Sequence, residues 1–179
     1  MVKRKNVLPI NLVSTLMRAN KATVRHLIWE NKKTYSNPQW VEFQTACRVN
    51  NAVREDVFFI ASYRAKKYEY DPEHRGGFVI EQSEKFNAAL MIGPNRVFAI
   101  DIDDTPHTNK KGIGLPYFKK TIESRAHIHI WCGQGYGYAE PFEDIDTVEN
   151  LLDVFQARAN LVIMGGIVHP MKGIQPRLL

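Results

Sequence analysis

The sequence predicts an α+β fold, in which an antiparallel β-sheet carries N-terminal and C-terminal helices packed on one face. Segments rich in β-forming residues follow one another from about residue 56, and short turns without a helical pattern connect them. Apolar residues at three- and four-residue spacing occur before and after this region. The 179 residues, 44% of them hydrophobic, suffice for one core, so we expect a single domain over 1–179.

Residues 1–50 are expected to form a basic helical segment. The apolar spacing predicts helix over 8–33, followed by a loop at 34–39 and a short helix over about 38–48. Residues 1–35 hold eight basic side chains and one acid, whereas the rest of the chain is close to neutral. Lys21 and Arg25 are therefore candidate phosphate contacts, with a solvated lysine-rich helix face as the alternative.

The sheet that carries the candidate site is expected within residues 55–140. Predicted strands cover 57–63, 78–80, 86–92, 97–103 and 125–131, with turn signals at Asp71-Pro72, Gly76-Gly77 and 93–95. A helix is predicted over 145–160, where Asp146 and Glu149 have the spacing of a capping box and Asn160 ends the apolar stripe. The tail at 165–179 is expected to be irregular.

Two predicted strands each place a pair of titratable side chains on one face. Because side chains alternate along a strand, Asp101 and Asp103 lie opposite the apolar set of the first strand. Arg125, His127 and His129 lie opposite the isoleucines of the second. If the strands are neighbours, all five share one open sheet surface.

The loops around these strands supply further candidates. His107 and Asn109 lie between the two strands, and Trp131, Tyr136 and Tyr138 follow the second one in a glycine-rich stretch. We consider His127, His129, His107, Asp101, Asp103 and Arg125 as catalytic candidates. Asn109, Tyr136, Tyr138, Trp131, Lys21 and Arg25 are the candidates for substrate binding.

Three interpretations of this cluster remain open. Alternating polar residues are typical of any half-exposed antiparallel strand, so the cluster can be a solvated face. His127, His129 and Asp101 can instead hold a divalent metal such as zinc, manganese or iron. The third interpretation is metal-free acid–base catalysis by the two histidines, with Arg125 stabilising negative charge.

Composition also limits the protein's environment. Cys47 and Cys132 are too few for a disulfide scaffold and lack the spacing of a zinc motif. No apolar run approaches the about 20 residues of a membrane helix, and polar residues interrupt the stretch after the basic start. We expect a cytoplasmic protein without a membrane partner.

Residues of about 95–160 resemble a family of small uncharacterised bacterial proteins that tend to sit in prophages and mobile elements. The resemblance rests on Asp101-Ile-Asp-Asp-Thr-Pro-His-Thr-Asn109, Ala126-His-Ile-His-Ile-Trp131 and Gly135-Tyr-Gly-Tyr-Ala139. Gln134 departs from the glutamate that the family tends to have there. The resemblance implies that Asp101, His107, Asn109, His127, His129 and Tyr136 form one unit, and it implies no established activity.

Three functions follow from these patterns. The first is a nuclease or other phosphodiesterase of a mobile element, with nucleic acid as the partner. The second is a non-catalytic binding protein, such as an inhibitor or an antitoxin-like regulator, with a protein partner. The third is a metalloenzyme that acts on a small molecule.

Overall fold

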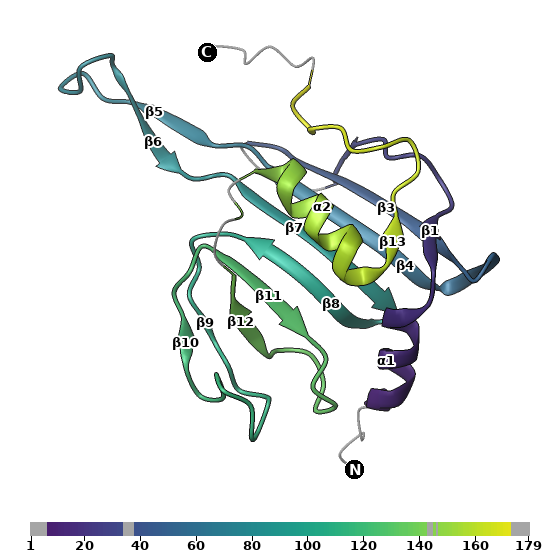
Figure 1. Cartoon of the computed structure of the whole chain (residues 1–179). Coiled ribbons are helices and arrows are strands. Elements are labelled where there is room, and N and C mark those ends of the chain that lie inside the picture. The colour runs from purple at the N-terminus through teal and green to yellow at the C-terminus, as the bar shows by residue number, and fades with distance from the viewer. Residues whose placement is uncertain (1–6, 34–37, 143–144, 146, 173–179) are drawn as a thin grey trace.

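The computed structural model describes residues 7–33, 38–142, 145 and 147–172. It confirms the α+β class, with a large sheet and two helices in the described part of the chain (Figure 1). The helices are α1 (Ile10–Arg18) and α2 (Val148–Ala159). The strands are β1 (Lys21–Thr23), β2 (Glu30–Asn31), β3 (Trp40–Val49), β4 (Ala52–Arg64), β5 (Lys67–Tyr70), β6 (Phe78–Gln82), β7 (Lys85–Ile92), β8 (Asn95–Ile102), β9 (His107–Thr108), β10 (Thr121–Ile122), β11 (Ala126–Ile130), β12 (Ala139–Pro141) and β13 (Leu161–Val162).

The central sheet has the order β12-β11-β8-β7-β4-β3-β1-β13, and β2 pairs with β3. All its pairs are antiparallel except that of β1 with β13, which joins the two ends of the chain side by side. The strands predicted at 57–63, 86–92, 97–103 and 125–131 correspond to β4, β7, β8 and β11. The predicted strand at 78–80 belongs to β6, which pairs with β5 in a separate hairpin that projects from the sheet (Figure 1).

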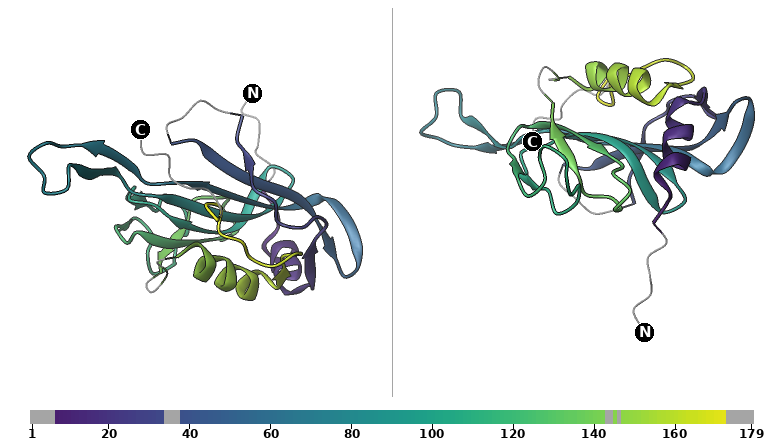
Figure 2. Two further views of the ribbon diagram at one scale, coloured as in Figure 1. Left: turned by 90° about the horizontal axis from the view of Figure 1, so that it is seen from above. Right: turned by 60° about the horizontal axis from the view of Figure 1, so that its bottom comes forward.

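One side of the sheet, the helix face, is covered by α2 and holds the aromatic core. Phe155 of α2 packs between Phe59 of β4 and Phe98 of β8, with both ring centroids 5.2 Å away. All three side chains are buried, and truncating such a core aromatic costs about 3–5 kcal/mol. The right-hand view of Figure 2 shows α2 on one side of the sheet and the loops around β9–β12 toward the other side, the site face.

The ends of α2 follow from its sequence. Asp146, expected as its cap, lies outside the described residues, and the helix begins after Thr147, whose hydroxyl accepts a hydrogen bond from the Asn150 amide. It ends at Asn160 in the left-handed conformation that asparagine tolerates, as predicted. Residues 165–172 are irregular, as expected, and 173–179 lie outside the described residues.

The expectation of a helical segment over 1–50 is wrong for the described residues beyond residue 18, which are 19–33 and 38–50; residues 1–6 and 34–37 lie outside the described part of the chain. The predicted short helix at 38–48 is strand β3, in which Phe43, Thr45 and Cys47 point inward and alternate with more exposed residues. That two-residue alternation, and the pairing of β3 with three neighbouring strands, outweighed the local helical spacing. Helix α1 ends at Arg18 because Ala19 is extended and Lys21 already belongs to β1.

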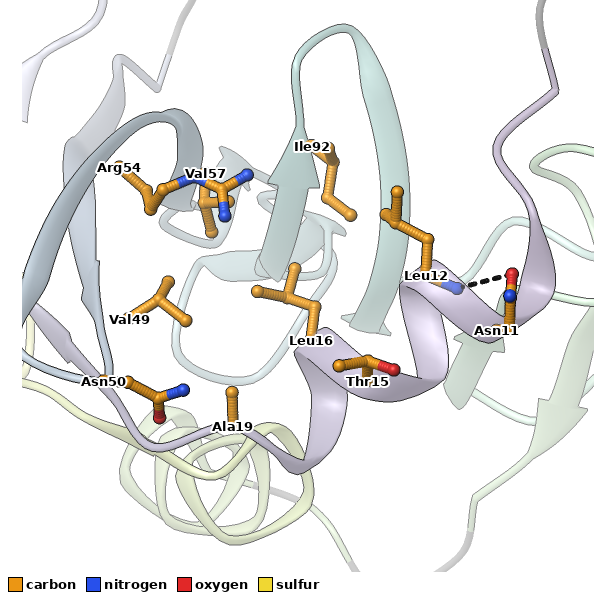
Figure 3. Close-up of a pocket in the computed structure, with 10 residues that line it drawn as sticks. All are labelled: Asn11, Leu12, Thr15, Leu16, Ala19, Val49, Asn50, Arg54, Val57 and Ile92. Carbon is orange, nitrogen blue, oxygen red and sulfur yellow. Dashed lines mark hydrogen bonds between the residues drawn. The ribbon is translucent and has the colours of Figure 1, made fainter.

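Helix α1 leans over the ends of β3, β4 and β7 and leaves a pocket of about 360 Å³ beside it (Figure 3). Leu16, Val49, Val57 and Ile92 give the pocket an apolar wall. Arg54 is the charged side chain among its lining residues, and its guanidinium is paired with Asp56. The pocket therefore offers no cluster of reactive groups.

Candidate metal centre

Strands β8 and β11 are antiparallel neighbours, which confirms the condition on which the predicted site depends. Asp101 on β8 is in register with His127 on β11, and His129 follows two residues later. Since residues two apart on a strand point to the same side, both imidazoles and the carboxylate lie on the site face. The isoleucine between the histidines is buried with the core, as the alternation predicted.

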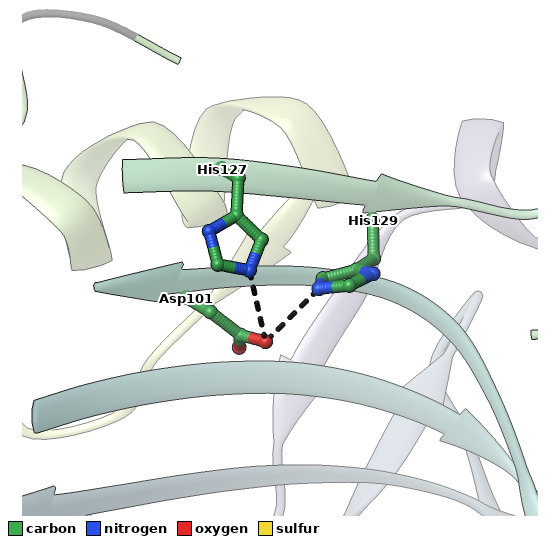
Figure 4. Close-up of side chains that lie close together, drawn as sticks. All are labelled: Asp101, His127 and His129. Carbon is green, nitrogen blue, oxygen red and sulfur yellow. Dashed lines mark ion pairs between the residues drawn. The ribbon is translucent and has the colours of Figure 1, made fainter. Parts of the chain in front are cut away.

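The three side chains converge on one point, and we call them the triad. His129 Nε2 lies 3.1 Å from Asp101 Oδ2, and His127 Nε2 lies 3.9 Å from the same oxygen. Figure 4 shows both rings reaching from β11 toward that carboxylate. One ligand atom from each residue lies within 4.8 Å of the other two, and the triad is the one metal-ligand group of this kind among the described residues.

The triad is buried, which excludes the solvated sheet face for these residues. The exposed fractions are 3% for His127, 3% for His129 and 8% for Asp101. Alternation along the strands correctly placed the three triad residues on the face opposite the helix. It could not predict that loops cover this face. The expectation of an open surface is therefore corrected to a covered site.

Burial and neighbouring charge set the ionisation of the triad. Burial lowers the pKa of His127 and of His129 below the ordinary value, and the negative charge of Asp101 opposes this effect without outweighing it. Burial alone raises the pKa of Asp101, but the hydrogen bond from His129 and the charge of Arg96 outweigh it and hold that pKa low. At neutral pH the site therefore contains two neutral imidazoles and one carboxylate.

Arg96 is the main component that sequence reasoning missed. Its Nη2 donates to Asp101 Oδ1, so the other carboxylate oxygen remains directed at the histidines. Arg96 and Asp101 are five positions apart in the sequence, so regular alternation places them on opposite faces of the strand. The register of β7 and β8 shifts between Leu90 and Met91, and this irregularity brings Arg96 to the site face.

His107 and Tyr136, both candidate site residues from the sequence, lie against the triad and help to cover it. The His107 ring centroid lies 4.8 Å from that of His129, and its Nε2 donates to the Gly137 carbonyl over 3.2 Å. The Tyr136 ring stacks on His129 at 5.1 Å, and its hydroxyl accepts a 2.7 Å hydrogen bond from Arg96. Burial raises the pKa of Tyr136 to about 12, so this residue is a neutral phenol at the site.

The structure does not bring Asp103 and Arg125 into the triad. The Asp103 carboxylate accepts a 2.6 Å hydrogen bond from the Thr105 amide, although its charge still acts on His127. Arg125 pairs with Asp104 at 3.2 Å and donates to the Glu84 carbonyl at 3.0 Å. Arg96, rather than Arg125, is thus the cation that contacts the site.

Three predicted substrate-binding residues have structural roles instead. Asn109 is 1% exposed, and its side-chain amide bonds the Tyr117 carbonyl and both backbone groups of Ala139. Tyr138 is completely buried and donates its hydroxyl to Glu140. Trp131 lies in the core and donates its indole N–H to the Leu8 carbonyl. Their polar groups are engaged within the protein, which the sequence pattern alone could not reveal.

Lys21 and Arg25 are likewise occupied elsewhere. Lys21 is 3% exposed, and its ammonium donates to the carbonyls of Leu16, Met17 and Ala19 at the end of α1. It therefore stabilises the helix C-terminus instead of binding phosphate. Arg25 donates to the Gln44 carbonyl at 2.6 Å and lies near Glu30.

The donor set fits a divalent transition metal. Two imidazoles and one carboxylate with further coordination positions open are typical of non-haem iron and catalytic zinc sites. Ligand atoms 2.0–2.2 Å from one ion lie about 3.0–3.4 Å apart, and the observed 3.1 Å and 3.9 Å separations are close to this range. The hydrogen bond from His129 to Asp101 places the ring proton of His129 on Nε2. Ion binding at Nε2 would replace that hydrogen bond and move the proton to Nδ1, which in both triad histidines is buried without a hydrogen-bond partner among the described residues.

Comparisons with protein-family models, curated proteins and solved structures found no match to this chain. The family resemblance of residues 95–160 therefore remains a prediction. Among the described residues, no helix is both long and apolar enough to cross a membrane.

Proposed function

We propose that this protein is a metal-dependent phosphodiesterase that cleaves nucleic acid, with zinc, manganese or iron held by Asp101, His127 and His129. The observation that carries the proposal is the convergence of one ionised carboxylate oxygen and two neutral imidazole nitrogens on one buried point. Metal ligands must be deprotonated, so the triad has the required charge state at neutral pH.

The proposed reaction is hydrolysis of a phosphodiester. An oxygen of water bonds to phosphorus, the bond from phosphorus to one ester oxygen breaks, and that oxygen takes the proton that water releases. The products are a phosphate monoester and an alcohol. A divalent ion at such a site polarises a phosphoryl oxygen and lowers the pKa of water.

The residues around the triad have separate roles in this proposal. Arg96 holds Asp101 Oδ1, which leaves Oδ2 directed toward the histidines. His107 has its Nε2 proton fixed by the Gly137 carbonyl, so in the neutral ring Nδ1 carries the lone pair that can accept a proton. Tyr136 is 41% exposed and lies over His129, at the solvent side of the site.

Metal content is the first test. Tag-free protein is analysed for zinc, manganese and iron, stripped with a chelator, and titrated with each ion. We expect one ion per chain in the wild type and none in Asp101→Asn or in His129→Gln. His74→Gln is the matched control, because His74 is exposed in the projecting β5–β6 hairpin, and it keeps the ion. Equal metal content in all four proteins contradicts the assignment.

Activity is the second test. Single-stranded RNA, single-stranded DNA, duplex DNA and the small diester bis(p-nitrophenyl) phosphate are incubated with stripped and metal-loaded protein. We expect cleavage only in the loaded wild type and in His74→Gln. Cleavage that persists after complete stripping contradicts the metal role and favours acid–base catalysis by the Asp101–His129 pair.

A small-molecule metalloenzyme is the second candidate, and the burial of the triad favours it. Side-chain exposures of 4% for each histidine and 11% for Asp101 leave little room for a wide polymer backbone at the ion. Hydrolysis of the small diester without cleavage of any polynucleotide supports this candidate over a nuclease.

A further inference from the structure

A lysine-rich lobe adjoins the triad. Residues 105–122 run from β8 toward β11 and contain four lysines and no aspartate or glutamate. Lys110, Lys111, Lys119 and Lys120 are all exposed. Tyr117 and Phe118 lie between the two lysine pairs in the sequence and are half-buried.

Hydrogen bonds anchor the backbone of the lobe to the segment that follows the triad histidines. Strands β9 and β10 pair at its base, where His107 is in register with Ile122. Asn109 ties the lobe to Ala139 through hydrogen bonds of 2.6 and 2.7 Å. The Gln134 side-chain oxygen accepts a hydrogen bond from the backbone amide of Gly112. The Tyr138 hydroxyl accepts one from the backbone amide of Tyr117.

The base of the lobe is also part of the site. His107 lies against both triad histidines, with ring centroids 5.9 Å from His127 and 4.8 Å from His129. Its hydrogen-bond partner is the Gly137 carbonyl, and Lys111 Cγ lies 3.7 Å from the position that a Cβ on Gly137 would occupy. Of the four lysines, Lys111 therefore lies next to the backbone segment that bonds His107 over the triad.

The aromatic side chains are combined with these charges. The Lys119 ammonium lies 5.5 Å from the Phe118 ring centroid, and the Lys120 ammonium lies 5.5 Å from that of Tyr117. Exposed cations that follow a phosphate backbone, next to aromatic rings on which bases stack, are the recurring means of binding single strands. Duplex DNA hides its base faces and offers such rings nothing to stack on.

We infer that the lobe formed by residues 105–122 binds single-stranded nucleic acid and directs its backbone to the triad, an inference that rests on the proposed function. Lys110, Lys111, Lys119 and Lys120 contact phosphates, and Tyr117 and Phe118 contact bases. This surface replaces Lys21 as the nucleic-acid contact, since the Lys21 ammonium is buried against backbone carbonyls, whereas the Arg25 side chain is 57% exposed.

Binding is tested apart from cleavage, with the full chain in chelator and fluorescein-labelled single-stranded RNA, single-stranded DNA and duplex DNA. A lobe variant carries Lys→Gln at 110, 111, 119 and 120. The matched control removes the same charge from exposed positions elsewhere, as Lys33→Gln, Arg48→Gln, Lys66→Gln and Lys172→Gln. Circular dichroism confirms that both fold.

We expect the lobe variant to bind single strands at least about tenfold more weakly than the wild type. The slope of log association constant against log salt concentration becomes less negative by about 3, as expected for the loss of four phosphate contacts. The control stays within about threefold of the wild type. A Tyr117→Leu/Phe118→Leu variant loses affinity with an unchanged salt slope, since stacking releases no counterions. Equal losses in the lobe and control variants, or tighter binding of duplex than of single strands, overturn the inference.

The outcomes separate this inference from the proposed function. Lobe-dependent binding without cleavage of any substrate leaves the inference standing and removes the nuclease. Metal-dependent cleavage of the small diester without single-strand binding leaves the phosphodiesterase and removes the lobe as a nucleic-acid surface.

Discussion

His129 and Asp101 face each other across two neighbouring strands, with Nε2 and Oδ2 3.1 Å apart in a site that solvent barely reaches. The other carboxylate oxygen is bonded to Arg96, so Asp101 has one oxygen for the cation and one for the histidines. Because each carboxylate oxygen has a hydrogen-bond or ion-pair partner, Asp101 can remain ionised although it is buried.

Arg96→Met is expected to destabilise the fold and weaken the ion site together. Asp101 then keeps a buried charge without its cation, which costs roughly 2–4 kcal/mol in the free energy of unfolding. Metal affinity falls about 10- to 100-fold because the carboxylate loses the partner that orients it. Urea unfolding and metal titration measure the two effects.

The control for this prediction is Arg125→Met, because the ion pairs of Arg125 are far more exposed than that of Arg96. We expect it to change the unfolding free energy by less than about 1 kcal/mol. Equal effects of the two substitutions contradict the role of Arg96.

Asn109→Asp is expected to destabilise the protein more at pH 7 than at pH 4.5. The side-chain amide of Asn109 donates to the carbonyls of Tyr117 and Ala139, and a carboxylate in its place turns a negative oxygen toward them. Protonation of the new acid restores one donor, so part of the loss is recovered as the pH falls. Thermal unfolding of the variant and the wild type at both pH values measures the difference. A loss that does not depend on pH shows that the amide donors are not what holds the lobe.

Gly112→Ala and Gly114→Ala form a matched pair. Both glycines have positive φ, +87° and +88°, so alanine costs about 1–2 kcal/mol of backbone strain at either position. Only the Cβ at 112 also collides with the Tyr138 ring, whereas that at 114 meets open space. We expect Gly112→Ala to cost roughly 1–3 kcal/mol more, measured by chemical unfolding. Equal costs mean that the lobe moves away from Tyr138 easily.

Lys21→Met tests the buried ammonium through its pH dependence. Burial lowers the pKa of Lys21 from 10.5 to about 8. Between these values the unfolded chain retains the proton that the folded chain has lost, so the free energy of unfolding of the wild type rises with pH over this window. The cost of burying the charge is complete below pH 8 and is relieved as the pH approaches 10.5.

The variant lacks this group, so its unfolding free energy lacks the pH-dependent contribution of the Lys21 ammonium. The unfolding free energy of the wild type minus that of Lys21→Met is therefore expected to increase by up to about 3 kcal/mol from pH 8 to 10.5. Urea unfolding at half-unit pH steps measures it. A constant difference over that range means that the ammonium titrates normally in the folded protein.

Runs of β-forming residues between turn signals were sufficient to predict β4, β7, β8 and β11, and alternation of side chains placed Asp101, His127 and His129 on one side of the sheet. It failed where pairing or irregular backbone decides the structure. Residues 40–49 became β3 because neighbouring strands were available, and a register shift moved Arg96 to the site. Asn109 and Lys21 donate hydrogen bonds to backbone carbonyls of the protein instead of binding a ligand. The sequence does not show which carbonyls lie near a polar side chain in the fold, so it could not predict these roles.

The triad, Arg96, His107, Tyr136 and the lysine lobe all come from residues 96–138, one uninterrupted quarter of the chain. Among the described residues, helix α1, the β5–β6 hairpin and residues 165–172 contribute none of the groups that would touch an ion. Insertions or substitutions in α1 or in the β5–β6 hairpin can therefore alter the binding surfaces of the protein and leave the side chains of the triad unchanged.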